Sequence, residues 1–410
     1  MSSSSCRFCG SALHHTFVDL GMSPLCQTHI TPEQLNEMEP FYPLHTYVCD
    51  NCFLVQLQEF VSPQDIFTEY AYFSSYVDAL LKNASAYSDL MVERFGLGSQ
   101  SKVVEIASND GYLLQYFVKK GIPVLGVEPA VNVSQVAKDK GIPVVNKFFG
   151  VETATELAAD GKADLLLGNN VLAHVPDIND FVGGMKIMLK PDGVITMEFP
   201  HLMRLMEENQ FDTIYHEHFS YLSFMAVERI FAFHGLTLFD VQEIPIHGGS
   251  LRIYARHTED TSKLVGERVT ELLAREKAAG FDKLETYAHF TEQVKETKRK
   301  LLEFLITAKQ KGKTVAGYGA PGKGNTLLNY CGIRTDFLDY TVDRNPYKQN
   351  KFTPGTHIPI YSPEKIRETK PDYLLILPWN VKDEVMEQVS YIREWGGQFV
   401  VPIPEVKVYA

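Results

Sequence analysis

Short apolar runs alternate with helix-like segments through the middle of the chain. The runs have the length of buried strands and lie at 102–107, 123–128, 143–147, 164–168 and 194–199. This alternation is typical of an α/β domain with a parallel, doubly wound sheet and right-handed crossovers. We assign residues 69–258 to this domain, with a helix at 224–233 and a closing strand pair at 237–242 and 251–256 that provides one antiparallel edge.

A second α/β pattern occupies the carboxyl-terminal part of the chain, which we assign to residues 259–410. Apolar residues recur at helical spacing across 286–310 and predict an amphipathic helix that leads into it. A strand at 314–317 then runs into a Gly-x-Gly-x-x-Gly motif at 317–322, and Asp343 follows further along the chain. This combination is the fingerprint of a dinucleotide-binding Rossmann fold.

Length and composition indicate a soluble protein of two or three domains. The chain has 410 residues, of which 45% are apolar and 22% are charged. No apolar run approaches the ~20 residues that span a bilayer, and the first residues lack the features of a secretory signal. The net charge of −12 argues against nucleic acid as a partner, because such binding depends on Lys and Arg. We therefore expect a cytoplasmic protein without a nucleic-acid or membrane partner, and nothing in the sequence demands more than a monomer.

Four of the six cysteines form two C-x-x-C pairs, Cys6 with Cys9 and Cys49 with Cys52. Two such pairs are a strong signal for tetrahedral zinc, and four thiolate ligands leave no open position for catalysis. A redox dithiol, which is the alternative, would need only one pair. We predict a structural Zn²⁺ ion that stabilises a small module over residues 1–68, whose own core is small.

The ends of the first two central strands predict a cofactor site. Gly111 lies in the turn after the first strand, where it would let a ligand approach the backbone, and Glu128 ends the second strand, where a carboxylate binds a ribose diol. The turn lacks the glycines of a pyrophosphate site, so S-adenosylmethionine fits better than a dinucleotide. A Rossmann-like sheet with an unrelated ligand is the alternative. The predicted cofactor-binding residues are Glu105, Ala107, Asn109, Gly111, Glu128, Pro129, Asn169 and Asn170.

A dense polar cluster follows the strand at 194–199. It contains the run Tyr-His-Glu-His at 215–218, just beyond the strand end, where α/β sheets open their ligand crevice. A histidine in this place can take a proton near neutral pH, whereas a solvated His-rich loop is the alternative. His174, which follows the strand at 164–168, is either a second functional histidine or a cap of the next helix.

Together these motifs identify a family. The chain resembles the deoxysugar C-methyltransferases, which act on nucleotide-linked 4-keto sugars, and the resemblance covers nearly the whole chain. It implies a zinc-binding amino-terminal module, a class I S-adenosylmethionine-dependent methyltransferase domain and a Rossmann-like carboxyl-terminal domain that helps to enclose the sugar nucleotide. The segments that carry it are the two cysteine pairs, 104–114, 170–177, 198–201, 215–220, 246–252 and 317–325.

The resemblance also implies roles for individual residues. It makes His218 the catalytic base, with Tyr215 and Glu217 beside it and His174 in the same pocket. We assign Tyr215 as the donor to the developing oxyanion, with His174 as the other candidate, and expect Glu217 to set the tautomer of the imidazole, directly or through water. The predicted substrate-binding residues are Tyr76, His247, Gly319, Lys323 and Asn325.

The resemblance also implies that the aromatic stretch at 67–76 supplies one more tyrosine to this pocket. We take Tyr72 as that residue, although Tyr70 or Tyr76 fits the motif nearly as well. The stretch alone could equally be a hydrophobic contact between domains or a lid over a ligand.

The resemblance implies methyl transfer to C3 of a 4-keto-deoxysugar, and dTDP is the nucleotide we expect on this sugar. A carbon next to a ketone can be deprotonated because the charge spreads onto oxygen as an enolate, whose carbon then attacks the sulfonium methyl. This requires a base at the carbon, a donor near the oxyanion and a methyl group held in line. The alternatives are an O- or N-methyltransferase acting on another small metabolite, an NAD-dependent enzyme that modifies a sugar nucleotide, and a binding module without catalysis.

Three interpretations of the carboxyl-terminal glycine motif remain open. Lys323 at the start of the following helix suits a diphosphate, because free amides at a helix N-terminus bind phosphates, and we favour the diphosphate of the sugar nucleotide. A ligand-free remnant of a Rossmann fold and a nicotinamide dinucleotide site are the alternatives.

Overall fold

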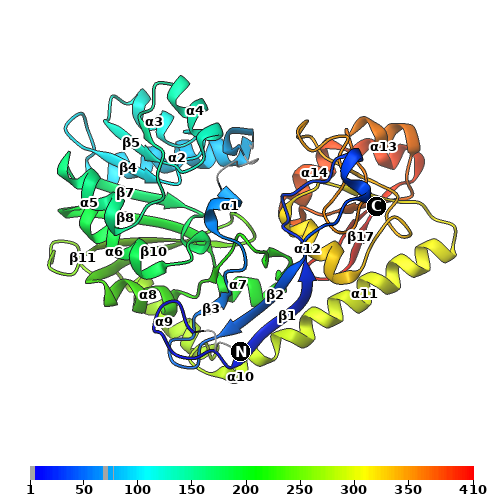
Figure 1. Ribbon diagram of the computed structural model, residues 1–410, viewed down its shortest axis with the longest axis horizontal. Helices are drawn as coiled ribbons and strands as arrows, with labels where there is room; N and C mark the ends of the chain where they lie inside the picture. The colour runs from blue at the N-terminus through cyan, green and yellow to red at the C-terminus, as the bar shows by residue number, and fades with distance from the viewer. Residues whose placement is uncertain (1–4, 68–72, 77) are drawn as a thin grey trace.

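The strands of the described residues form three sheets, one each in the amino-terminal module, the central domain and the carboxyl-terminal domain (Figure 1). The structure is a computed structural model that describes residues 5–67, 73–76 and 78–410. Tyr70 and Tyr72 lie outside the described residues. Among the helices of the described part, none has the length and apolar character needed to cross a membrane.

The central sheet has seven strands in the order β10-β11-β8-β7-β4-β5-β6. Strands β4 to β8 run parallel, and β11 runs antiparallel to both of its neighbours, β8 and β10. The predicted closing pair is present, but its antiparallel strand lies inside the sheet and not at the edge. The strands are β4 (Val103–Ile106), β5 (Val124–Val127), β6 (Val144–Val145), β7 (Ala163–Asn169), β8 (Leu189–Pro200), β10 (Leu236–Ile244) and β11 (Ser250–His257).

Helices cover both faces of the central sheet, which explains why its strands are continuous apolar runs. Along β7, Leu166 belongs to the core on one face, while Leu165 and Leu167 belong to the core on the other. The predicted helix at 224–233 is confirmed as α8. The surrounding helices are α2 (Asp78–Phe95), α3 (Leu114–Lys119), α4 (Val131–Asp139), α5 (Val151–Ala159), α6 (Ile178–Met188), α8 (Phe224–Phe233) and α9 (Glu267–Ala278).

The amino-terminal sheet incorporates a piece of the central domain. Its antiparallel order is β1 (His15–Ser23), β2 (Tyr42–Val48), β3 (Val55–Leu57) and β9 (Ser220–Tyr221). Strand β9 follows the polar run at 215–218 directly. The zinc-binding module therefore holds the end of this run in a fixed register.

The connection between β1 and β2 crosses to the carboxyl-terminal domain, where its blue ribbon lies among the elements of that domain in Figure 1. Ile30 exchanges backbone hydrogen bonds of 3.0 and 2.8 Å with Phe352. The Glu39 carboxylate accepts from the Gly355 amide at 2.8 Å and lies 3.0 Å from His357 Nε2. One small module thus contacts both larger domains.

The carboxyl-terminal sheet has the order β14-β13-β12-β15-β16-β17 and is parallel except for β17. The helix predicted at 286–310 is divided at His289 into two helices. The ring centroids of Tyr287 and Phe290, which lie on either side of this division, are 6.2 and 4.7 Å from the ring centroid of Phe17. The elements are α10 (Leu284–Ala288), α11 (Phe290–Gln310), β12 (Val315–Tyr318), α12 (Gly322–Cys331), β13 (Thr341–Val342), β14 (Ile360–Tyr361), α13 (Glu364–Thr369), β15 (Tyr373–Ile376), β16 (Gln398–Val401) and β17 (Lys407–Tyr409).

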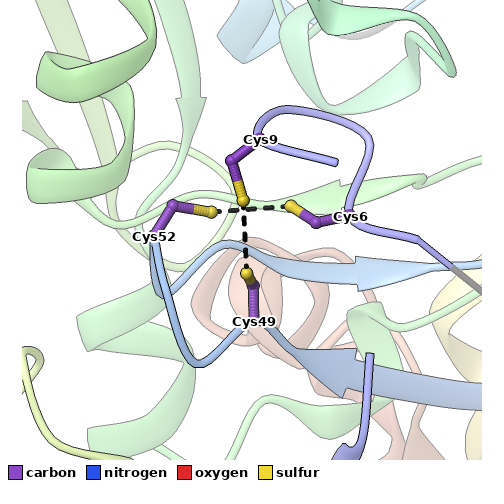
Figure 2. Close-up of side chains that lie close together, drawn as sticks. All are labelled: Cys6, Cys9, Cys49 and Cys52. Carbon is purple, nitrogen blue, oxygen red and sulfur yellow. Dashed lines mark hydrogen bonds between the residues drawn. The ribbon is translucent and has the colours of Figure 1, made fainter. Parts of the chain in front are cut away.

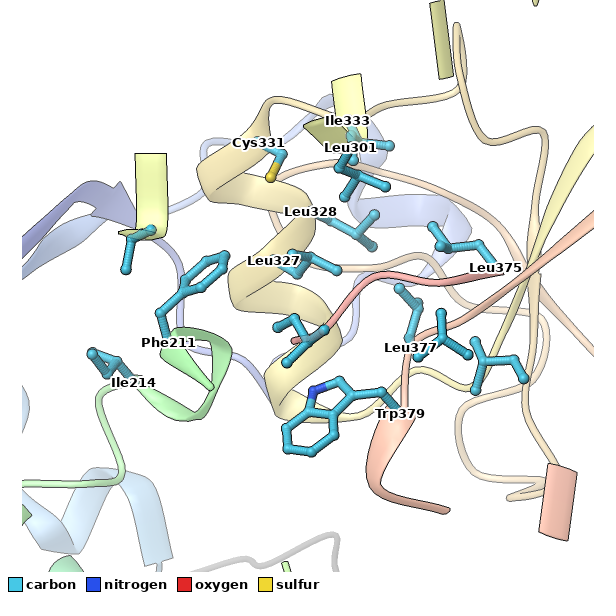
Figure 3. Close-up of a cluster of buried hydrophobic side chains, with 14 of the residues drawn as sticks. Phe211, Ile214, Leu301, Leu327, Leu328, Cys331, Ile333, Leu375, Leu377 and Trp379 are labelled. Carbon is cyan, nitrogen blue, oxygen red and sulfur yellow. The ribbon is translucent and has the colours of Figure 1, made fainter. Parts of the chain in front are cut away.

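One hydrophobic core extends across the domains. Figure 3 shows Phe211 and Ile214, which directly precede the polar run, in the same cluster as Leu327 and Leu328 of α12. Buried residues of the amino-terminal sheet, such as Phe17, belong to this core as well. The polar run is therefore held between packed elements on both sides.

Candidate active site

A cavity of about 670 Å³ lies at the carboxyl ends of the central strands and reaches the carboxyl-terminal domain. Parallel α/β sheets bind their ligands at this edge. All three parts of the chain contribute to its walls. The lining residues include Ala107, Glu128, Asn169 and Glu198 at or near the strand ends; His174, Tyr215, Glu217 and His247; Lys323, Lys348 and Asn380 of the carboxyl-terminal domain; and Gln27 of the amino-terminal module.

The turn after β4 has a strained backbone that meets Glu128. Ala107 (φ +57°), Asn109 (φ +48°) and Gly111 (φ +73°) all adopt left-handed conformations, which are uncommon for residues other than glycine. The Asn109 and Ala130 amides each donate to the Glu128 carboxylate at 2.9 Å, and burial raises the pKa of Glu128. The turn and this carboxylate form one wall of the cavity.

Asn169 and Asn170 form the neighbouring wall after β7. Their side-chain oxygens are buried and have no hydrogen-bond partner among the described residues, and Asn170 has a left-handed backbone (φ +54°). Buried acceptors are normally satisfied, so these oxygens suit a polar ligand. With Glu128 for ribose hydroxyls and Pro129 beside it, the residues fit S-adenosylmethionine.

Two predicted cofactor residues do not reach the cavity. Glu105 is 1% exposed and is not among the described lining residues; burial and the charge of Glu128 raise its pKa. Gly111 was expected to admit a ligand, but a Cβ there would lie 2.5 Å from Ile142 Cδ1 and 3.0 Å from Ala137 Cβ. Packing within the protein therefore requires this glycine.

His218 lies in a cluster of rings at the cavity wall. Its ring centroid is 4.1 Å from that of Tyr215 and 4.6 Å from that of His174. Those two side chains line the cavity, whereas His218 is not among the described lining residues. Burial and the neighbouring His174 lower the pKa of His218 well below its ordinary value, so its ring is neutral near pH 7.

The Thr213 carbonyl, and not Glu217, sets the tautomer of His218. His218 Nδ1 lies 2.9 Å from Thr213 O, and because a carbonyl can only accept, Nδ1 carries the proton. The lone pair is then on Nε2, which is buried without a hydrogen-bond partner in the described part of the chain. Glu217 lines the cavity and accepts a hydrogen bond from the Cys26 thiol at 3.4 Å. Thr213, and not Glu217 directly, is therefore the partner that fixes the tautomer.

Two further histidines line the cavity in neutral form. Burial, with the nearby His247, lowers the pKa of His174 to about 4. Burial and the charge of Lys323 lower the pKa of His247 to about 4, and His247 has a left-handed backbone (φ +56°) at the tip of the β10–β11 hairpin. His174 ends a short 3₁₀ helix, Leu172–His174, and does not cap α6, because Asp177 accepts from Asp180 N there.

Lys323 brings a positive charge into the cavity from the first turn of α12. Its Nζ donates to Asn380 Oδ1 at 2.7 Å and lies 4.7 Å from the centre of the Trp379 ring. The indole donates to Asp212 Oδ2 at 2.7 Å, and burial raises the pKa of Asp212 to about 7. Lys348 is a second lysine at this end. Two cations beside a helix N-terminus suit an anionic ligand.

Protein atoms crowd two glycines of the motif at 317–322, Gly319 and Gly322, although Gly322 also lines the cavity. A Cβ at Gly319 would lie 2.6 Å from Pro378 Cδ, and a Cβ at Gly322 would lie 2.9 Å from Cys26 Sγ. A dinucleotide needs these glycines so that its pyrophosphate can approach the backbone. Here other side chains occupy the space.

Asp343 is also engaged by the protein. Its Oδ2 accepts from the Ala320 amide at 2.8 Å and lies 3.5 Å from Lys348 Nζ. A nicotinamide site would need this carboxylate for a ribose. Together with the crowding at Gly319 and Gly322, this disfavours the nicotinamide interpretation.

Three predicted substrate residues lie away from the cavity wall. Gly319 and Asn325 are not among the described lining residues; Asn325 is 4% exposed within α12. Tyr76 is 60% exposed, and its ring lies 5.5 Å from that of Phe73. Of the predicted substrate residues, only His247 and Lys323 line the cavity.

The four predicted zinc ligands converge at a site away from the cavity. Figure 2 shows the side chains of Cys6, Cys9, Cys49 and Cys52 pointing toward one another, and their sulfur atoms all lie within 4.8 Å of one another. The Cys6–Cys52 and Cys9–Cys49 sulfur distances are both 3.5 Å, close to the ~3.8 Å expected around tetrahedral zinc with Zn–S bonds of ~2.3 Å. Gln56 Nε2 donates to Cys6 Sγ at 3.2 Å, which suits a thiolate ligand.

Several lining residues were missed by the sequence analysis. Lys348 and Asn380 follow β13 and β15, so the rule that strand ends face the ligand could have found them. Glu198 lies near the end of β8, where its Oε1 accepts from Arg252 at 2.6 Å. Gln27 belongs to the amino-terminal module, and no sequence signal connects it with this cavity.

Comparison with known proteins adds three family models that match consecutive parts of the chain. A zinc binding domain matches residues 6–67, a methyltransferase domain matches residues 79–241, and a C-methyltransferase C-terminal domain matches residues 245–404. The middle model agrees with the cofactor wall, and the first contains the four clustered cysteines.

The chain is also similar to individual proteins and to solved structures. The C-methyltransferase NovU of Streptomyces niveus is 37% identical over 404 residues, which are 98% of this chain and 96% of the relative. A ubiquinone biosynthesis O-methyltransferase of Bartonella bacilliformis is 31% identical over 99 residues, 23% of this chain and 39% of its own. A solved S-adenosylmethionine-dependent methyltransferase of Clostridium acetobutylicum covers 47% of this chain and 94% of its own, with a TM-score of 0.36 and 13% identity.

Proposed function

We propose that this chain, which belongs to the C-methyltransferase family and uses S-adenosylmethionine, methylates C3 of a nucleotide-linked 4-keto-deoxysugar. The nucleotide we propose is dTDP, and the reaction passes through an enolate. The observation that carries the proposal is one continuous cavity. It joins the cofactor wall at Glu128, the ring cluster at Tyr215 and His174, and the cationic end at Lys323.

The base in this proposal is His218. Its Nδ1 proton is held by Thr213 O and its Nε2 lone pair has no partner among the described residues, so the ring is ready to accept a proton. Bound S-adenosylmethionine supplies an electrophilic methyl group. Tyr215 and His174 line the cavity and contact the His218 ring, which is not among the described lining residues, so the proposal requires the bound substrate to bring its acidic carbon up to Nε2.

Tyr215 is the proposed donor to the oxyanion. Burial and the nearby Glu217 raise the pKa of Tyr215 well above its ordinary value, so its hydroxyl stays protonated and can donate to the developing charge. A donor in a site that excludes water is worth more than one in solution. His174, neutral and lining the same wall, is the other candidate.

The cationic end supports a substrate with phosphates. Lys323 and Lys348 line the cavity together with Gly322, the first residue of α12. A diphosphate bound there would leave the sugar between the cation and the ring cluster. Phosphate recognition by a helix N-terminus and lysines is well suited to this group.

The direct test is incubation with S-adenosylmethionine and a panel of dTDP-4-keto-6-deoxyhexoses in heavy water. With S-adenosylmethionine, we expect mass spectrometry to show that the product has gained a methyl group on carbon. With S-adenosylhomocysteine in its place, so that no methyl group can be transferred, we expect the hydrogen at the acidic carbon to exchange with deuterium. A product methylated on oxygen or nitrogen would overturn the C-methylation proposal for these sugars. Methyl gain without any exchange in the presence of S-adenosylhomocysteine would remove the freely formed enolate from the mechanism.

A further inference from the structure

The connection between β1 and β2 places one cysteine of the amino-terminal module against the proposed catalytic cluster. Cys26 is not one of the four clustered cysteines. It is 3% exposed, and its Sγ donates to Glu217 Oε1 at 3.4 Å. On its other side it packs against Gly322, where an added Cβ would come within 2.9 Å of the sulfur. Cys26 thus lies where the three parts of the chain meet.

The backbone around Cys26 is held from both directions. The carbonyl of Gln27, which lines the cavity, lies 3.1 Å from His29 Nδ1, and Ile30 pairs with Phe352 of the carboxyl-terminal domain. At the other end β1 and β2 lead back to the cysteine pairs. A loop fixed in this way can hold a side chain in one position relative to Glu217.

The thiol is suited to donate this hydrogen bond. Burial, together with the adjacent Glu217 carboxylate, raises the pKa of Cys26 well above its ordinary value, so the sulfur keeps its proton near pH 7. An ionised carboxylate such as that of Glu217 has no proton to donate and is an acceptor only. The donor and acceptor roles are therefore complementary.

We propose that Cys26 is a positioning residue, whose thiol holds the Glu217 carboxylate at the cavity wall and thereby makes the amino-terminal module part of the geometry of the reaction. The kinetic test of this proposal uses a substrate chosen from the proposed function. The hydrogen bond between Cys26 and Glu217 does not depend on that function. Cys26 acts through Glu217 and does not contact the reacting atoms.

The kinetic test compares Cys26→Ala, Cys26→Ser and Cys331→Ala in the full-length, zinc-loaded protein. Cys331 is also buried, within the core of α12 (Figure 3), and is the matched control for loss of a buried thiol. Loss of a hydrogen bond to a charged group predicts a kcat about tenfold lower for Cys26→Ala. With the hydroxyl as a new donor, Cys26→Ser should recover to within about threefold of wild type. Cys331→Ala should keep kcat, and KM for S-adenosylmethionine should stay unchanged in all three. Equal kcat values for Cys26→Ala and Cys331→Ala would overturn the proposal.

A spectroscopic measurement tests the hydrogen bond without turnover. The S–H stretching band of Cys26 is isolated as the infrared difference between wild type and Cys26→Ser. We expect Glu217→Gln to shift this band, because a neutral amide is a weaker acceptor than a carboxylate. An unshifted band would overturn the proposal. If the band shifts while wild type fails to methylate any 4-keto sugar, the positioning contact stands and the proposed substrate fails.

Discussion

The two domains of this chain that carry a strand–turn–helix ligand motif use their turns in opposite ways. The turn after β4 lacks the full glycine pattern, yet Ala107 and Asn109 line the cavity beside Glu128. The turn after β12 has the complete pattern, yet Gly319 faces Pro378 and the equivalent acid, Asp343, holds the turn itself. A glycine pattern shows where a backbone needs space, and in the second turn the protein fills that space.

The largest expected effect is that of replacing His218, which tests whether the reaction takes place in the central domain, the domain that contains the turn after β4. His218→Asn should lower kcat at least about a thousandfold, because the general base and the activation of the carbon are lost together. Affinity for S-adenosylhomocysteine should stay within about twofold in calorimetry, since His218 is not among the described residues of the cofactor wall.

His174→Asn is the companion variant, because His174 lines the cavity and contacts the His218 ring. We expect a smaller loss of kcat than for His218→Asn. If His218→Asn retained near-wild-type turnover while His174→Asn did not, the base would be His174.

The next largest effect comes from removing the acidic side chain that follows each turn, Glu128 in the central domain and Asp343 in the carboxyl-terminal domain. Glu128→Ala should weaken S-adenosylhomocysteine binding about a hundredfold, because two hydrogen bonds to ribose hydroxyls are worth ~2–3 kcal/mol together. Asp343→Ala, the matched variant in the second turn, should leave this Kd unchanged, since its carboxylate is bound to the Ala320 amide. Measurable NADH binding by wild type that Asp343→Ala abolishes would reverse the comparison.

The sequence predicted more of the fold than of the site, for a physical reason. Alternation of apolar runs depends on local burial, so the central strands and α8 follow from it. Strand ends share one edge of a parallel sheet, so Ala107, Glu128 and Asn169 were also predictable. Local patterns end there.

Residues that meet across domains could not be predicted. Gln27 and Cys26 reach the site only because the β1–β2 connection crosses to the carboxyl-terminal domain. Gly111 and Gly319 were assigned to ligand approach, but a turn glycine is required equally by a ligand or by a packed side chain. Sequence alone does not distinguish these two causes.

A stability measurement tests that the second turn is filled. Gly319→Ala should destabilise the protein by about 2–4 kcal/mol, the sum of left-handed strain and overpacking against Pro378. Gly332 is the matched control, since it is also left-handed (φ +73°) but a Cβ there would meet nothing within 4 Å. Gly332→Ala should cost only about 1 kcal/mol. Equal losses in chemical denaturation would mean that Pro378 does not occupy the space.

A smaller effect separates substrate binding from cofactor binding. Lys323→Met should raise KM for the sugar nucleotide about tenfold, because one charge-assisted contact to phosphate is lost, and should leave the Kd for S-adenosylhomocysteine unchanged. An increase in that Kd without a change in the sugar-nucleotide KM would assign Lys323 to the cofactor. Lys313, which pairs with Asp372 on the surface at 2.8 Å, provides a control for loss of a carboxyl-terminal lysine.

The smallest expected effect is the pH dependence of the reaction. Burial lowers the pKa of His218 well below its ordinary value and that of His174 to about 4. A base whose pKa is depressed stays neutral as pH falls and loses activity only below that pKa, so kcat/KM should change less than about twofold between pH 8 and pH 6. A base with an ordinary histidine pKa of ~6.5 would instead lose about fourfold over this range. Preincubation at pH 6 should first show that the enzyme is stable there. A fourfold loss of kcat/KM would then mean that the acting histidine is solvated and that the buried His174 and His218 do not supply the base.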